Sequence, residues 1–110
     1  MAAHFALKTA GNGQFMFNLV AGNNEIVLTS ETYSSKAAAE AGIASVKHNA
    51  PNDANYERKT AKDGSPYFSL KSAANGQIIG RSEMYSAVAA MEKGIKAVMT
   101  AAASAATKEV

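Results

Sequence analysis

Ser30-Glu31-Thr32-Tyr33-Ser34 recurs almost unchanged as Ser82-Glu83-Met84-Tyr85-Ser86, and the fold prediction starts from this recurrence. The match continues on both sides of the motif. Toward the C-terminus it keeps a shift of 52 residues through identical pairs: Ala37/Ala89, Glu40/Glu92, Gly42/Gly94, Ile43/Ile95 and Val46/Val98. Toward the N-terminus one inserted residue near Ala73 or Ala74 changes the shift to 51, and further identical pairs follow: Lys8/Lys59, Gly13/Gly64, Phe17/Phe68 and Leu19/Leu70. Identities this dense in one register establish a tandem duplication.

Each copy is predicted to contain three short strands. Turn residues stand at matched places, with Asn12-Gly13 in the first copy and Asp63-Gly64 in the second. Such pairs are strong hairpin signals because both residues tolerate positive φ. Phe15, Phe17 and Leu19 recur at every second position, which is the period of a strand with one buried face. Each copy therefore reads as strand, turn, strand, turn, strand.

A helix is predicted after each copy of the motif. The apolar period changes there from two to about 3.6 residues, through Ala39, Ile43, Val46 and Ala50 in the first copy and Met91, Ile95, Val98 and Ala102 in the second. Ser34 and Ser86 stand just before these segments, and we expect them to be the N-caps. Gly42 and Gly94 fall within the helices, where glycine costs about 1 kcal/mol relative to alanine. We expect them to mark a close approach of the helix to the sheet or to the other helix.

The predicted fold class is α+β, with one core shared by both copies. A unit of about fifty residues buries too little surface to be comfortably stable alone. We therefore expect a single compact domain over residues 1–110, built of repeat one (4–50) and repeat two (56–101). The repeats would share one antiparallel sheet, with both helices packed on one face and a pseudo-twofold axis. Asn49–Asn55 would be the linker, and the alanine-rich tail after Thr100 would extend the second helix before it frays at Thr107–Val110. Because the repeats pair with each other, we expect a monomer.

Taken together, the residues resemble a known family. The pattern is Lys-x-x-x-Asn/Asp-Gly, aromatic-x-Leu, Asn-Gly, Ser-Glu-x-Tyr-Ser and Ala-Ala-x-x-Gly-Ile. It is similar to the YegP-like family of uncharacterised small bacterial proteins, in its duplicated subfamily, over roughly residues 4 to 100. The resemblance implies a small α+β fold of repeated three-strand-plus-helix units forming one sheet. It also implies that the segment after each helix can add a further strand, exchanged between repeats. It implies no activity, because the family has none established.

Composition excludes several classes of protein. The chain has no cysteine, so disulfides, thiolate metal sites and cysteine nucleophiles are excluded. The apolar runs are far shorter than the ~18 residues of a membrane-spanning helix. The N-terminal residues lack a basic segment followed by a long apolar run, so we expect no secretory signal and a cytoplasmic location. His4 and His48 are not matched between the copies and have no partner at helical spacing. We therefore expect no metal, no cofactor and no catalytic residue.

The repeated motif admits two interpretations. As a site, Ser30, Glu31 and Tyr33 with Ser82, Glu83 and Tyr85 would frame a cleft, and Glu31 and Glu83 would be paired acid/base carboxylates. As structure, the motif turns a strand into a helix, with the tyrosine packing and the serine capping. We favour the structural interpretation, and with it a protein that is not an enzyme.

Charge suggests the remaining candidate surface. The net charge is −1 over residues 1–55 and +3 over residues 56–110. Four basic residues of repeat two would contact a polyanion: Arg58, Lys59, Lys71 and Arg81. The bases of a single nucleic-acid strand would stack on Tyr67 of the sheet face, which these residues flank. The preferred prediction is a small binding or interaction module with a protein partner, bound by edge-strand addition or in a groove between the copies. Nucleic-acid binding is the first alternative, and an enzyme using Glu31 and Glu83 is the second.

Overall fold

Each copy folds as its pattern predicts, into three strands followed by a helix. The computed structural model describes residues 2–110. Repeat one forms β1 (His4–Thr9), β2 (Phe15–Val20), β3 (Ile26–Ser30) and α1 (Lys36–Asn49). After a 3-10 helix (Asp53–Asn55), repeat two forms β4 (Tyr56–Thr60), β5 (Pro66–Lys71), β6 (Ile78–Arg81), α2 (Val88–Ser104) and a final strand, β7 (Ala106–Glu109). The hairpin glycines adopt the expected positive φ, 81° at Gly13 and 87° at Gly64.

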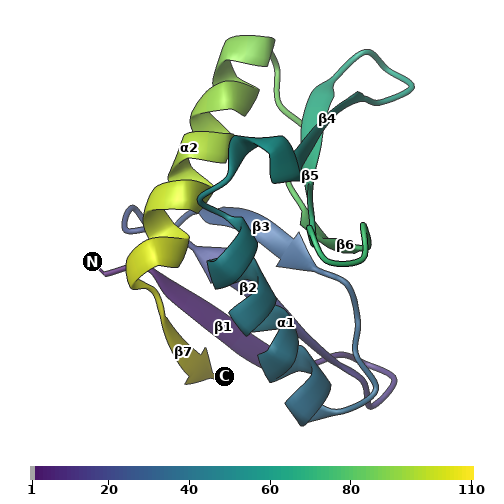
Figure 1. The fold of residues 1–110 in the computed structure, drawn as a ribbon, viewed down its shortest axis with the longest axis vertical. Coiled ribbons are helices and arrows are strands. Elements are labelled where there is room, and N and C mark those ends of the chain that lie inside the picture. Colours follow the sequence, from purple (N-terminus) through teal and green to yellow (C-terminus); the bar gives the residue numbers. More distant parts are fainter. Residues whose placement is uncertain (1) are drawn as a thin grey trace.

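The strands join into one sheet in the order β4-β5-β6-β3-β2-β1-β7 (Figure 1). The repeats meet at its centre, where β3 and β6 pair antiparallel through Thr29↔Arg81 and Ser30↔Gly80. Gly80 is required there, because a Cβ would lie 2.8 Å from the carbonyl oxygen of Thr29. All neighbouring strands are antiparallel except β7, which runs parallel to β1. The pseudo-twofold axis passes between β3 and β6, so that β4 and β1 are equivalent strands.

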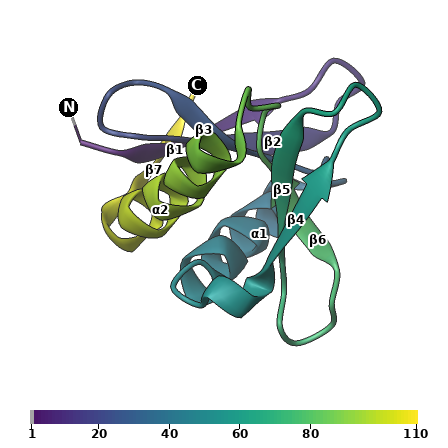
Figure 2. The same ribbon diagram turned by 90° about the horizontal axis from the view of Figure 1, so that it is seen from above.

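Both helices pack on one face of the sheet (Figure 2). Each contacts strands of both repeats: α1 packs on β2 and also on β5 and β6, and α2 packs on β5 and also on β2 and β3. The aromatic contacts obey the same symmetry, with ring centroids 5.8 Å apart for Phe5–Phe17 and 5.7 Å apart for Tyr56–Phe68. The predicted α+β class is confirmed. The Cα radius of gyration of 13.2 Å is close to the value of about 13 Å typical of one domain of this size, which supports our proposal that residues 1–110 form a single domain.

Gly42 and Gly94 lie where the tyrosine of each motif packs on its helix. A Cβ at Gly42 would overlap the hydroxyl of Tyr33, and one at Gly94 would overlap the hydroxyl of Tyr85. The close approach predicted from the sequence is therefore present. The approaching group is a tyrosine ring, not the sheet backbone or the other helix.

The predicted N-caps, Ser34 and Ser86, are wrong by one residue. Ser35 caps α1, and its side-chain oxygen accepts a hydrogen bond of 3.0 Å from the amide of Ala38. The equivalent residue before α2 is Ala87, which has no side-chain cap. The helix starts later than predicted because Tyr33 still pairs with the backbone of Phe15 in the sheet.

The unequal caps yield a first prediction. Ala87→Ser is expected to raise the free energy of unfolding by about 0.5–1 kcal/mol, because a serine at this position accepts an otherwise unpaired amide hydrogen of α2. Ser35→Ala is expected to lower it by about 1 kcal/mol. Urea denaturation followed by circular dichroism measures both changes, with Ser86→Ala as the neutral control. A destabilised Ala87→Ser protein would contradict this assignment.

The C-terminal tail was predicted to extend the second helix, and this holds only as far as Ser104. The next residues turn away and form β7, which pairs with β1 of the other repeat. The strand ends with the amide of Val110 donating to the carbonyl of Leu7 at 2.9 Å. The family resemblance implied a strand exchanged between repeats, and β7 is such a strand.

Candidate functional site

The two edges of the sheet are related by the pseudo-twofold axis, but only one of them is covered by a further strand. At one edge, β7 covers β1 in the register His4↔Ala106 to Leu7↔Glu109. At the other edge, β4 pairs with β5 on one side, and no strand among residues 2–110 pairs with its other side. We call this unpaired side of β4, from Tyr56 to Thr60, the open edge.

The backbone of Arg58 is the centre of the open edge. Arg58 pairs with Phe68 as its counterpart Leu7 pairs with Phe17. Successive residues of an antiparallel strand direct their amide and carbonyl groups to alternate sides. Since the carbonyl of Leu7 accepts a hydrogen bond from the β7 side, the amide and carbonyl of Arg58 are directed outward, away from β5.

The side chains around the open edge are neutralised within the protein. Arg58 donates from Nε to Glu92 Oε2 at 2.6 Å and from Nη2 to Asp53 Oδ1 at 2.9 Å. These bonds, to Glu92 first, raise the pKa of Arg58, and Arg58 lowers the pKa of Glu92. Glu57 lies between Lys59 at 3.0 Å and Lys71 at 3.3 Å, and the two lysines lower its pKa. Arg58 is exposed, and among residues 2–110 its outward amide and carbonyl have no hydrogen-bond partner in a turn, loop or side chain.

One difference between the repeats lies beside this edge. The first residue of α1, Lys36, forms an ion pair with Glu109 of β7. The first residue of α2 is Val88, whose exposed fraction is 62%. Val88 precedes Glu92 by four positions and so shares its helix face, and Glu92 contacts Arg58. Where one edge has a lysine paired with the strand that covers it, the open edge has an exposed aliphatic side chain.

The four basic residues predicted to bind a polyanion do not form one patch. Glu57, Ser69 and Arg81 are in register across β4, β5 and β6. Lys59 and Arg81 belong to the face opposite the helices, whereas Arg58 reaches α2 on the helical face. Arg81 lies 3.7 Å from Glu31. Because each of the four basic side chains has a carboxylate neighbour, the positive potential expected over this surface is reduced.

The repeated motif makes the same backbone contacts in both copies. Ser30 Oγ accepts a hydrogen bond from the amide of Phe17 at 2.9 Å and donates one to the carbonyl of Glu31 at 2.7 Å. Ser82 Oγ does the same with Phe68 and Glu83, at 3.0 and 2.8 Å. In each copy the serine hydroxyl therefore bonds backbone groups at the end of its strand. These contacts favour the structural interpretation of the motif.

The two candidate carboxylates do not share a cavity. Glu31 lines a cavity of about 600 Å³ with Tyr33 and Gln77, between α1 and the turn before β6, and Glu83 does not line it. Burial, and then the charge of Glu31, raise the pKa of Tyr33. The enzyme hypothesis pairs Glu31 with Glu83 at one site, and this cavity contains only the first of these two carboxylates.

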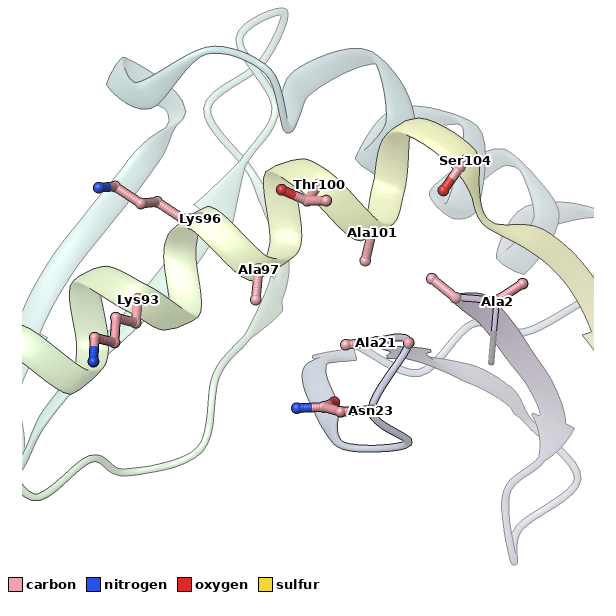
Figure 3. A pocket seen from close by; sticks show the side chains of 11 residues that line it. Ala2, Ala21, Asn23, Lys93, Lys96, Ala97, Thr100, Ala101 and Ser104 are labelled. Carbon is pink, nitrogen blue, oxygen red and sulfur yellow. The ribbon is translucent and has the colours of Figure 1, made fainter.

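A second cavity, of about 520 Å³, lies along α2 (Figure 3). Ala97 and Ala101 face Ala21 across it, and Lys93 is at one end (Figure 3). In repeat one the counterpart of Ala101 is the buried Asn49, whose Oδ1 accepts from the amide of Ala73 at 3.0 Å. Loss of that side chain opens the space along α2. Its lining combines alanines with five polar side chains: Asn23, Lys93, Lys96, Thr100 and Ser104. We take the open edge as the stronger candidate, because β7 on β1 shows within this molecule what an equivalent edge binds.

Two further observations concern metals and membranes. Among residues 2–110, no three His, Asp or Glu side chains lie close enough together to hold a metal ion. Within the same residues, neither helix is both long and apolar enough to span a bilayer.

Sequence reasoning missed the open edge as a specific site. Edge-strand addition was predicted in general, but the strand that would receive it was not. A signal was present in the comparison of the two copies, where a cation, Lys36, is matched by an aliphatic residue, Val88. This difference could not be interpreted from the sequence, because the sequence does not show that the tail forms β7 or that Glu109 of β7 pairs with Lys36.

Comparison with known proteins gives relatives along the whole chain. The model of a domain of unknown function (DUF1508) matches twice, over residues 10–57 and 61–109. The UPF0339 protein of Bordetella pertussis is 61% identical over 109 residues, which are 99% of this chain and 96% of that protein. UPF0339 protein YegP of Escherichia coli O157:H7 is 54% identical over 98 residues, which are 89% of this chain and 88% of that protein.

Two solved structures share the fold. The solution NMR structure of a UPF0339 protein from Shewanella oneidensis has a TM-score of 0.91 at 47% identity, covering 99% of this chain and 92% of that one. The solution NMR structure of YegP from Escherichia coli, a protein of unknown function, has a TM-score of 0.92 at 50% identity, covering 99% and 93%.

Proposed function

We propose, from the premise that this chain belongs to the DUF1508 family in its tandem form, that it is an interaction module which binds an extended segment of a partner protein along the open edge of β4. The relatives confirm the resemblance to YegP-like proteins. The family is described as a domain of unknown function.

A single observation carries this proposal. The pseudo-twofold axis relates β4 to β1, and β1 holds a four-residue strand that β4 lacks. A sheet edge of this kind binds extended segments through backbone hydrogen bonds, with alternate side chains giving specificity. β7 is an example within the same molecule of the ligand that such an edge accepts.

The charged residues of β4 are compatible with a selective edge. Short edge strands carrying charges resist indiscriminate pairing with other sheets, and Glu57, Arg58 and Lys59 are three charges in succession. Their ion pairs are formed within the protein. The charged side chains of β4 are therefore already paired within the protein. The outward amide and carbonyl of Arg58 are the groups that a partner strand would bond.

Arg58→Pro tests the proposal, with Arg58→Ala as its matched control. Both remove the ion pairs of Arg58, but only proline removes the outward amide, and proline is tolerated in edge strands. Seven-residue peptides selected from a displayed library on the native protein are expected to bind Arg58→Ala about as well as the native protein. They are expected to bind Arg58→Pro at least tenfold more weakly in a titration.

Thermal melting checks that both variants remain folded. If the selected peptides bound the two variants equally, their site would lie elsewhere and the open edge would not be the binding surface. If no peptide were enriched on the folded native protein, the proposal of strand addition would be wrong.

Two other functions stay predictions from the sequence. Single-stranded nucleic acid would contact Lys59, Lys71 and Arg81 on the face opposite the helices. A labelled single strand retarded at low salt, with affinity falling as salt rises, would support it. An enzyme using Glu31 and Glu83 would need a substrate that bridges both carboxylates, and activity lost in Glu31→Gln and Glu83→Gln alike would support it.

A further inference from the structure

The direction and register of β7 on β1 indicate how a partner segment would bind at the open edge. β7 runs parallel to β1, and its Lys108 and Glu109 lie opposite Ala6 and Leu7. Transferred by the pseudo-twofold axis, a bound segment would run parallel to β4. Its third residue would lie opposite Glu57, and its fourth opposite Arg58. In neighbouring strands, residues in register point to the same face, so the fourth side chain would point toward α2 as Glu109 points toward Lys36 of α1.

We infer, on the basis of the function proposed above, that the partner segment runs parallel to β4 and carries an aliphatic residue at this fourth position, next to Val88. The contrast between the repeats supports this. Glu109 is held by Lys36, whereas the equivalent residue at the open edge is the exposed Val88. An aliphatic side chain there removes apolar surface of Val88 from water, which is favourable.

An acidic side chain at the same position would be disfavoured. It would lack the cation that Lys36 provides. Arg58, which lies opposite it in register, is already paired with two carboxylates, Glu92 and Asp53, so the net charge of these three groups is negative. Like charges brought together in this way reduce affinity and give specificity.

The same contrast argues against a second copy of this chain as the occupant. The C-terminal strand of another copy would place its own Glu109 beside Val88 and Glu92. The open edge would therefore reject the strand that its equivalent edge binds, and chains would not join end to end through β7. The partner is a different protein, with an extended segment that carries an aliphatic residue at the fourth position.

The test uses two peptides that differ at one residue. Both correspond to Ser104–Val110, one with the native sequence and one carrying Glu109→Leu. Each is titrated into the isotope-labelled full chain, and amide NMR signals of β4 and of β1 are followed separately. The leucine peptide is expected to shift signals of β4 and to bind there at least fivefold more tightly than the native peptide.

Val88→Lys provides the reciprocal measurement. Val88 is exposed, so the substitution is expected to leave the fold intact, and it recreates the cation of repeat one at the open edge. In this variant the preference at β4 is expected to reverse, with the native glutamate peptide binding more tightly than the leucine peptide. Signals of β1 report any exchange of the peptide with β7 and are expected to be the same in both proteins.

The outcomes separate this inference from the function on which it rests. If both peptides shifted β4 equally, and Val88→Lys changed nothing, strand addition would stand but the aliphatic preference would be wrong. Binding of the leucine peptide away from β4 would also overturn the inference. A third outcome is that neither peptide binds, while library-selected peptides bind the native protein and lose affinity for Arg58→Pro. In that case the preference for an aliphatic fourth residue would be wrong, and strand addition at the open edge would stand.

Discussion

Phe17→Ala is expected to lower the free energy of unfolding of the whole chain by about 3–5 kcal/mol, the range for deleting a buried phenylalanine side chain. Phe17 is fully buried, packs edge-on against Phe5 at 5.8 Å and stacks on Tyr33 at 6.2 Å. Because α2 also packs on β2, the cavity would lie in a core that both repeats use. The loss is a large fraction of the 5–15 kcal/mol that is typical of natural domains.

The test of a shared core is whether both repeats lose stability together. Phe68→Ala, at the symmetry-equivalent position, is expected to have an effect of the same size, because its contacts with Tyr56 and Tyr85 are nearly identical. Urea denaturation followed by hydrogen exchange should give one transition, with amides of both repeats destabilised by either substitution. Protection retained in repeat two of Phe17→Ala would show that the repeats fold independently, against our proposal of a single domain.

The parts of the fold that the sequence predicted are those that the two copies specify twice. The turns at Gly13 and Gly64, the alternation through Phe17 and the helix stripe through Val46 follow local rules of φ and period. Each copy also checks the other. Agreement between the copies is therefore sufficient to predict the strands, the helices and a sheet shared by both repeats.

The parts that it missed depend on contacts between distant segments. The alanines after Thr100 continue the helix to Ser104, as their propensity favours. The residues expected to fray form β7 instead, because they pair with the edge of β1. The N-caps moved by one residue because Tyr33 pairs with Phe15 across the sheet. Local propensity contains neither of these long-range contacts.

The candidate site was the least predictable feature for the same reason. The sequence marked basic residues of repeat two, but it could not show that Glu92 lies against Arg58 or that Lys71 shares Glu57 with Lys59. The open edge is defined by a strand that one repeat has and the other lacks. The difference between Val88 and Lys36 becomes informative only once the structure shows that Lys36 pairs with Glu109 of β7.

Simultaneous replacement of both motif serines, Ser30→Ala with Ser82→Ala, is expected to lower the free energy of unfolding by about 2–6 kcal/mol. Each change leaves a buried strand amide, that of Phe17 or Phe68, without its acceptor, which costs about 1–3 kcal/mol. The two sites serve separate strands, so their effects should add. Each exposed fraction is below one tenth, 7% for Ser30 and 6% for Ser82, so water would not replace the lost bond without opening the strand end.

The control for this pair lies within the same motif. Ser34 and Ser86 are exposed, and their replacement by alanine is expected to change the free energy of unfolding by less than about 0.5 kcal/mol. Comparison of the two double variants by urea denaturation separates a structural motif from a functional one. If Ser30→Ala with Ser82→Ala left stability unchanged and instead weakened peptide binding, the motif would belong to a site. The structural assignment predicts the reverse, because the serine hydroxyl ends a strand at the place where Glu31 and Thr32 leave the sheet and Tyr33 rejoins it.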